Sequence, residues 1–259
     1  MPLMKTSNPA LGANTFRNVP GQYGTLNGGT IDAAARMTLN GTVNKTGILL
    51  LCAMATAAWT WSQFLQSGDL SVAGPLVMVG AIGGLIVALI TTFKKEWSPV
   101  TAPIYALLEG LVLGGLSAVL NMRYPGIAMQ AVGLTFGTLF VLLLVYRSGL
   151  IKVTAKFRLG VVAATGGIML FYLAEMLLSF FGINFIAVNN GSPIGIVVSL
   201  VVVGIAALNL VLDFDFVEQG VTYGAPKYME WYAAFGIMVT LVWLYLEILR
   251  LLAKMRSRN

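Results

Sequence analysis

Seven long apolar runs, separated by short polar links, constrain the fold of this 259-residue chain more than any other feature. Each run is close to the roughly 20 residues that an α-helix needs to cross the hydrocarbon core of a bilayer. The runs are expected at Thr46–Leu65, Ser71–Phe93, Pro99–Leu120, Ile127–Tyr146, Leu159–Phe180, Ile194–Phe214 and Trp231–Ala253. The sequence therefore predicts an all-α membrane protein, a multi-pass bundle of seven transmembrane helices.

The low charge content supports this prediction. Only 10% of the residues are charged and 58% are hydrophobic, whereas a soluble domain carries about 25% charged residues. A soluble fold is thereby excluded, and the lipid bilayer is the first expected partner. The net charge of +6 fits basic loops beside anionic lipid. No basic stretch is interleaved with aromatic residues, so we expect no nucleic-acid partner.

The polar residues before the first run are expected to form a separate part of the chain. Residues 1–45 are rich in Gly, Asn and Thr, and they contain no apolar segment followed by a cleavage site, so they are not a cleaved signal peptide. We predict a flexible N-terminal tail over residues 1–45 and a seven-helix transmembrane domain over residues 46–259. The alternative is that TLNGTVNKTG, residues 38–47, forms an ordered cap on the first span.

Missing residue types argue against catalysis. The chain has no histidine, which removes the imidazole pH switch, histidine metal sites and Ser-His chemistry. Its one cysteine, Cys52, cannot form an intramolecular disulfide. A retinal protein needs a lysine within the last helix, where the first lysine is Lys254 at its end. The motifs of intramembrane aspartyl proteases are also absent, so we predict that the chain is not an enzyme and holds no cofactor.

The distribution of basic residues predicts the orientation. With the N-terminus in the cytoplasm, the outer loops hold only Arg123, as the positive-inside rule favours. The cytoplasmic segments then hold Arg36, Lys45, Lys94, Lys95, Arg147, Lys152, Lys156, Arg158 and Lys227. Seven spans place the basic C-terminal end outside, against the rule; in the alternative, one run is re-entrant and both ends are cytoplasmic. We predict seven spans and a cytoplasmic N-terminus.

Carboxylates inside the apolar runs are the candidates for function. A charged side chain at the bilayer centre costs roughly 2.5–3.5 kcal/mol, so such groups face a cavity, share a proton or meet a cation. The candidates for an ion pathway and pH sensor are Asp213, Asp215, Glu247, Glu109 and Glu175. If they converge, they form a ladder of oxygen ligands suited to a hard cation such as Ca²⁺. Asp213 and Glu247 are the candidate metal ligands.

Two of the candidates have structural alternatives. Arg250 follows Glu247 by three positions, so a local ion pair on one helix face would also explain Glu247. Glu175 could accept a hydrogen bond from Tyr172 or from a hydroxyl of another helix. Glu230, by contrast, stands at the start of the last span, where a carboxylate suits the helix N-terminus.

Asp213 and Asp215 are two positions apart, so on a helix they point to different faces. We expect Asp213 to be the buried member of the two. A carboxylate out of water and beside a second carboxylate holds its proton more tightly than an exposed one. Two groups that share a proton would hold two helices together at one pH and bind a cation at another, so we expect Asp213 to act as a proton-controlled gate.

Three segments carry a resemblance to a known family. They are SPVTAPIYALLEGLVLGGLS in the third run, LVLDFDF at the end of the sixth and LYLEILRLL in the last. Together with the seven runs, they make the chain similar to the Bax inhibitor family (transmembrane Bax inhibitor motif proteins), in its bacterial branch with YccA-type and YetJ-type members. The resemblance covers residues 46 to the C-terminus and implies a bacterial inner membrane protein.

The resemblance implies a bundle whose C-terminal helix is central. It also implies a pH-sensitive Ca²⁺ leak channel governed by an acidic pair from the last two helices, for which Asp213 matches the first member. The local pattern makes Glu247 the second member of the acidic pair. Counting from the chain end instead places the second member at Thr240, which cannot titrate. In that case Asp215 takes the role of the second acid. YccA-type members imply an alternative, a non-transporting regulator that binds a membrane protease. The oligomeric state stays open.

Overall fold

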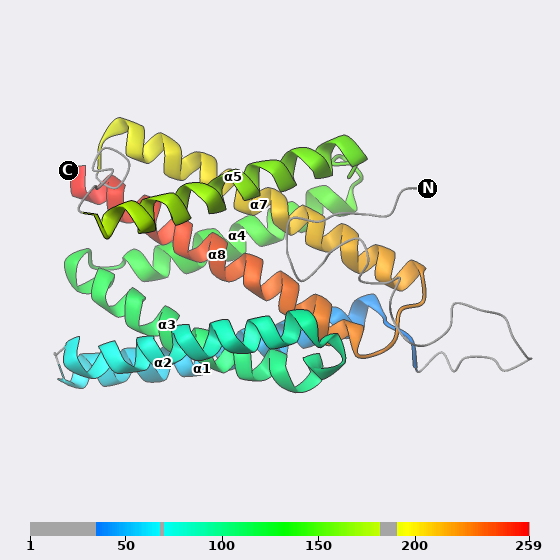
Figure 1. Ribbon diagram of the computed structural model, residues 1–259, viewed down its shortest axis with the longest axis horizontal. Helices are drawn as coiled ribbons and strands as arrows, with labels where there is room; N and C mark the ends of the chain where they lie inside the picture. Colours follow the sequence, from blue (N-terminus) through cyan, green and yellow to red (C-terminus); the bar gives the residue numbers. More distant parts are fainter. Residues whose placement is uncertain (1–34, 68–69, 182–190, 259) are drawn as a thin grey trace, which may run out of the picture. The chain divides into compact units, whose positions relative to one another are not determined.

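The computed structural model describes residues 35–67, 70–181 and 191–258, which fold into seven long α-helices and one short 3-10 helix. The helices are α1 Leu39–Ser67, α2 Leu70–Phe93, η3 Lys95–Trp97, α3 Ser98–Arg123, α4 Ile127–Arg147, α5 Ala155–Ser179, α7 Pro193–Thr222 and α8 Met229–Arg258 (Figure 1). All seven α-helices are long and apolar enough to cross a membrane. The prediction of an all-α, seven-helix, multi-pass membrane protein is confirmed.

The first helix begins at Leu39 and not at Thr46. Residues 39–45, which the sequence assigned to the tail, are therefore helical, as the alternative of an ordered cap foresaw. The Thr38 side chain accepts a hydrogen bond from the Gly41 amide at 3.0 Å, which satisfies one of the amides left open at a helix start. The rest of the predicted tail, residues 1–34, lies outside the described residues.

The chain divides into two compact units. The first contains Met1–Gly115 and Leu212–Val239, and the second contains Leu116–Val211 and Thr240–Asn259. The first unit thus combines α1, α2 and the start of α3 with the end of α7 and the start of α8. The second unit combines α4 and α5 with the remaining parts of α3, α7 and α8.

In the first unit, α3 lies very close to α1 through two glycines. A Cβ atom at Gly110 would overlap Thr56 and the backbone of Ala53, and one at Gly114 would overlap the backbone of Ala57. Small residues at four-residue spacing allow this approach of two helix backbones. These two glycines therefore allow α3 to pack closely on α1.

Glycines in α2 and in α4 differ in how closely another helix approaches them. Gly80 in α2 faces α3, where a Cβ atom would lie 2.6 Å from the Leu108 carbonyl oxygen, so α2 also packs closely on α3. In α4, a Cβ atom at Gly133 or Gly137 would meet no heavy atom of the described residues within 4 Å. The same four-residue spacing in α4 therefore brings no helix of the described chain into close contact.

The N-terminal part of α3 also packs against α8 within the first unit. Tyr105 and Phe235 meet edge to face, with ring centroids 5.0 Å apart and an interplanar angle of 78°, an arrangement that aromatic quadrupoles favour. The Ser98 hydroxyl donates to the Tyr228 carbonyl at 3.1 Å, just before α8 begins. These contacts fix the start of α8 against α3.

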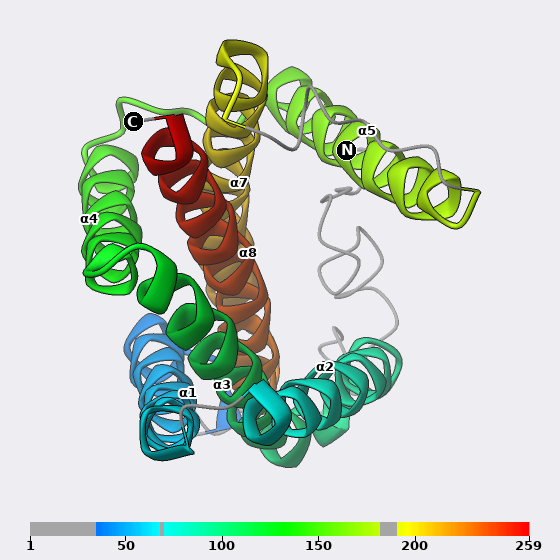
Figure 2. The ribbon, with the colours of Figure 1, turned by 90° about the vertical axis from the view of Figure 1, so that its left-hand side faces the viewer.

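The second unit is held by polar contacts between helices. Ser117 and Tyr245 share a hydrogen bond of 2.6 Å between α3 and α8. Asn209 in α7 donates to Thr165 in α5 at 2.8 Å. The C-terminal half of α8 lies beside α4 (Figure 2), where Arg256 donates to the Pro125 carbonyl at 2.7 Å.

Burial along the spans agrees with the expectation of a central C-terminal helix. In α8, 61% of the most apolar window is buried, against 44% or less in the other six spans. A helix that is buried on most sides must be surrounded by other helices. At the other extreme, only 6% of the corresponding window of α5 is buried.

The contact between α1 and α3 predicts a difference between two Gly→Ala substitutions. Gly110→Ala should lower stability by about 1–3 kcal/mol, because the added methyl group overlaps the α1 backbone. Gly133→Ala should be neutral or stabilising by up to about 1 kcal/mol, because alanine favours helix and nothing opposes it. Thermal unfolding in detergent measures both, and equal effects would contradict the packing described above.

Candidate functional site

The acidic end of α7 lies in the first unit. Asp213 is 1% exposed, whereas Asp215 is half-buried on another face of the helix. Asp213 is thus the buried member of the two, as expected. Asp215 accepts a hydrogen bond of 2.6 Å from the Gln219 amide one turn later. The sequence of α7 contains three acidic residues and no Lys or Arg, so the helix itself offers these carboxylates no opposite charge.

Glu109 is the second intramembrane acid of the first unit. It is half-buried in α3, and the Tyr105 hydroxyl one turn earlier donates a hydrogen bond to it. A Cβ atom at Gly84 would lie 3.5 Å from the Glu109 carboxylate, so the glycine leaves room for the acid against α2. The structure therefore places this carboxylate at the contact between α2 and α3.

Glu247 lies in the second unit, where it is 2% exposed. Its Oε1 atom accepts hydrogen bonds from Arg250 and from the Tyr172 hydroxyl, both at 3.0 Å. Arg250 also donates to the Tyr172 hydroxyl at 2.7 Å and lies over its ring. Glu247 Oε2 is buried without a hydrogen-bond partner in the described part of the chain. The local ion pair considered for Glu247 is therefore present, and Tyr172 joins α5 to it.

The remaining acid of the second unit is Glu175, half-buried in α5. Tyr172 was a candidate hydrogen-bond donor to Glu175, but in the structure its hydroxyl donates to Glu247. The two candidate metal ligands belong to different units, Asp213 to the first and Glu247 to the second. Among the described residues, no three Cys, Asp or Glu side chains gather into a set that could hold a metal ion.

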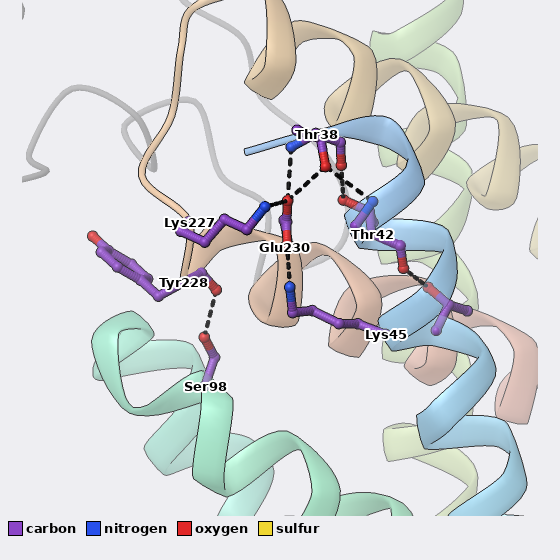
Figure 3. Close-up of polar contacts among 9 residues, drawn as sticks. Thr38, Thr42, Lys45, Ser98, Lys227, Tyr228 and Glu230 are labelled. Atoms are coloured by element: carbon purple, nitrogen blue, oxygen red, sulfur yellow. Dashed lines mark hydrogen bonds and ion pairs between the residues drawn. The ribbon is translucent and has the colours of Figure 1, made fainter. Parts of the chain in front are cut away.

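Glu230 forms a polar cluster that the sequence did not predict. It lies in the first turn of α8, as expected, but its side chain is fully buried. It pairs with Lys45 of α1 and, at 2.9 Å, with Lys227 of the preceding loop. The amide and the hydroxyl of Thr38 both donate to it at 2.8 Å (Figure 3). We call Thr38, Lys45, Lys227 and Glu230 the Glu230 cluster.

Lys227 precedes Glu230 by three positions, but no sequence spacing connects Thr38 or Lys45 to Glu230. Lys45 precedes Glu230 by 185 positions and Thr38 precedes it by 192. The sequence feature that could have indicated the cluster is Gly41, which lies one helical turn before Lys45 on the same face of α1. A Cβ atom there would overlap the Glu230 carboxylate, so this glycine makes room for a buried acid.

The loop between α7 and α8 lies directly beside the cluster. Gly224 ends α7 in a left-handed conformation with φ 68°, and the Gly224 and Ala225 amides donate to Val221 at 3.0 Å and Gly220 at 2.9 Å. This is the Schellman pattern that satisfies the last carbonyls of a helix. The next residue, Pro226, forms an antiparallel bridge with Arg36.

The ion pair of the second unit can be tested by a double-mutant cycle. Arg250→Met should destabilise by about 1–3 kcal/mol, because it leaves the buried Glu247 carboxylate without its charged donor. The double variant Glu247→Gln/Arg250→Met should cost less than the sum of the single changes. Thermal unfolding gives the coupling free energy, with the exposed Arg258→Met as control. Additive effects would mean that the pair contributes nothing.

Comparison with known proteins identifies the family. A sequence model of the family described as "Bax inhibitor 1 like" matches residues 8–257. No curated protein and no solved structure matches the chain. The match extends over nearly the whole chain, including the three segments that carried the resemblance, while membership of the bacterial branch stays a prediction. The chain belongs to the Bax inhibitor 1 like family.

Proposed function

We propose that the protein is a pH-sensitive cation leak channel in a bacterial inner membrane, with a cytoplasmic N-terminus and with Ca²⁺ as the transported cation. The observation that carries this proposal is the burial of Asp213, which is 1% exposed within a membrane span. The span has acidic residues and no basic residue. Membership of the Bax inhibitor 1 like family supports the same function.

A carboxylate in this position has few stable states. In hydrocarbon it is costly as a bare anion, so it is stable when protonated, when hydrogen-bonded to donors, or when a cation is near. Protonation removes the negative charge and with it the attraction for a cation. Cation binding and proton binding at Asp213 therefore compete, and flux should fall as the medium is acidified.

The other carboxylates extend the proposal. Glu109 and Asp215 in the first unit, and Glu175 in the second, are half-buried acids within spans, and we assign them to the cation pathway. Glu247 is held by Arg250, so a cation must compete with the guanidinium for that site. Because hard cations prefer oxygen ligands, Ca²⁺ is the best match to this set.

The proposal contains no catalytic step. The chain has no histidine, and its intramembrane acids are assigned to cation and proton binding. We therefore propose that the protein is not an enzyme and carries no resident cofactor.

The proposal predicts that Asp213→Asn abolishes the pH dependence of Ca²⁺ flux. Asparagine keeps the size of the side chain but cannot titrate, so the proton no longer competes with the cation. Flux is measured in proteoliposomes across a pH range around neutrality. Glu218→Gln, an exposed acid on the same helix, is the matched control and should keep the pH dependence of the unmodified protein.

Two outcomes would contradict this proposal. Unchanged pH dependence in Asp213→Asn would remove Asp213 as the sensor. Absence of flux in the unmodified protein at every pH would leave the non-transporting regulator of a membrane protease as the remaining function.

A further inference from the structure

We propose that residues 35–45 are a clamp that holds the corner between α7 and α8, and that release of this clamp frees the acidic end of α7 and raises cation flux. The effect on flux rests on the proposed leak function, whereas the effect on the position of α7 does not. Every residue that carries the inference belongs to the first unit.

The first contact of the clamp is made by the backbone. The Met37 amide donates to the Ala225 carbonyl at 2.7 Å, and the Lys227 amide donates to the Ala35 carbonyl at 2.9 Å. These bonds flank the bridge between Arg36 and Pro226. Pro226 itself need not donate, so proline is tolerated there and stiffens the loop. The segment before α1 is therefore bonded directly to the two residues that flank Pro226.

The second contact is electrostatic. The Glu230 side chain is 0% exposed, and Lys45 and Lys227 are 16% and 49% exposed. One carboxylate thus ties three parts of the chain together: the start of α1, the loop after α7 and the first turn of α8 (Figure 3). Removal of one partner of a buried ion pair leaves the other charge uncompensated. Loss of the Glu230 carboxylate therefore removes the contacts to Lys45, Lys227 and Thr38 together.

The third contact is steric. Gly41 brings the α1 backbone so close to Glu230 that a methyl group would overlap the carboxylate. A glycine in the first turns of a helix weakens that helix, and here it makes room for the buried acid. Glycine at position 41 thus lowers the stability of α1 but permits the contact with Glu230.

The clamp acts on the acidic end of α7 because α7 is one continuous helix to Thr222. Asp215 lies nine residues before Gly224, about 13 Å along the helix axis. The clamp bonds to Ala225, the residue that completes the cap of α7. A shift of this corner must therefore move the last turns of the helix, including the turn with Asp215 and Gln219.

A disulfide that locks the clamp gives the first test. In the bridge the pair exchanges no hydrogen bonds of its own, so its Cα atoms are expected about 4.5 Å apart, within the roughly 4.4–6.8 Å that a disulfide needs. We expect oxidised Arg36→Cys/Pro226→Cys, in a Cys52→Ala background, to show lower Ca²⁺ flux in proteoliposomes than the reduced protein. Reduction should restore the flux, and the two single cysteine variants should not respond to oxidant.

Variants that release the clamp give the opposite test. Gly41→Ala weakens the clamp by steric overlap with the Glu230 carboxylate, and Glu230→Gln weakens it by loss of the ion pairs. Each should raise Ca²⁺ flux about fivefold, the shift of a two-state equilibrium that a weakening equal to one net hydrogen bond produces. Gly47→Ala is the matched control on α1, because a Cβ atom there meets nothing within 4 Å. The locking disulfide keeps the proposal testable if a release variant fails to fold.

A readout that does not depend on flux separates the clamp from the leak. Val217 is 6% exposed in α7, so Val217→Cys should react slowly with a water-soluble thiol reagent and several times faster when combined with Gly41→Ala. The clamp as a regulator would be overturned if Gly41→Ala left the labelling rate of Val217→Cys unchanged. It would also be overturned if Gly41→Ala raised the labelling rate but did not change the flux of a conducting protein. Faster labelling with no flux in any variant would overturn the leak and support the clamp as the restraint on α7.

Discussion

The cost of a carboxylate in hydrocarbon is the constraint on which this structure depends. Each buried acid meets that cost differently. Glu230 is surrounded by two lysines and two donors from Thr38. Glu247 is held by Arg250 and Tyr172. Asp213 lies on a helix that carries acids and no base. The first two arrangements stabilise helix contacts, and the third is the one to which we assign the proposed response to protons and cations.

Close approach of helix backbones makes these arrangements fit. α1 accepts α3 at Thr56 and Ala57 through glycines of α3, and it accepts the Glu230 carboxylate at its own Gly41. One helix thus meets a neighbouring helix along its length and a buried charge at its start. The same four-residue spacing in α4 brings no other helix of the described residues into such contact.

The proposed function and the proposed clamp meet in one helix. α7 carries Asp213 and Asp215 and ends in the cap to which the N-terminal segment is bonded. A channel that controls flux by protonation needs an acid whose surroundings change. A clamp at the end of the same helix supplies a second influence on those surroundings. Protonation and release of the corner would then act on the same carboxylates at the C-terminal end of α7.

The membrane fold followed from the sequence because each apolar run is long enough to span a bilayer as a helix. The family followed from the resemblance of three segments within those runs. The pair between Glu247 and Arg250 was an alternative that the sequence offered, because residues three positions apart on a helix can meet. Asp213 was also expected to be buried, and Glu230 was expected at a helix start. The leading prediction placed residues 39–45 in the tail, although they are helical, because a polar first helical turn has the same composition as a tail.

Only the tertiary structure decided how Glu230 is neutralised and where the N-terminal segment is attached. Lys45 and Thr38 are separated from Glu230 by most of the chain, and no local pattern specifies such a contact. Packing between helices also decided that Gly110 lies against α1, while a Cβ atom at Gly133 would meet none of the described residues within 4 Å. The sequence by itself determined which segments enter the membrane; the packing of those segments determined which charges meet, because ion pairs depend on distance in space and not on distance along the chain.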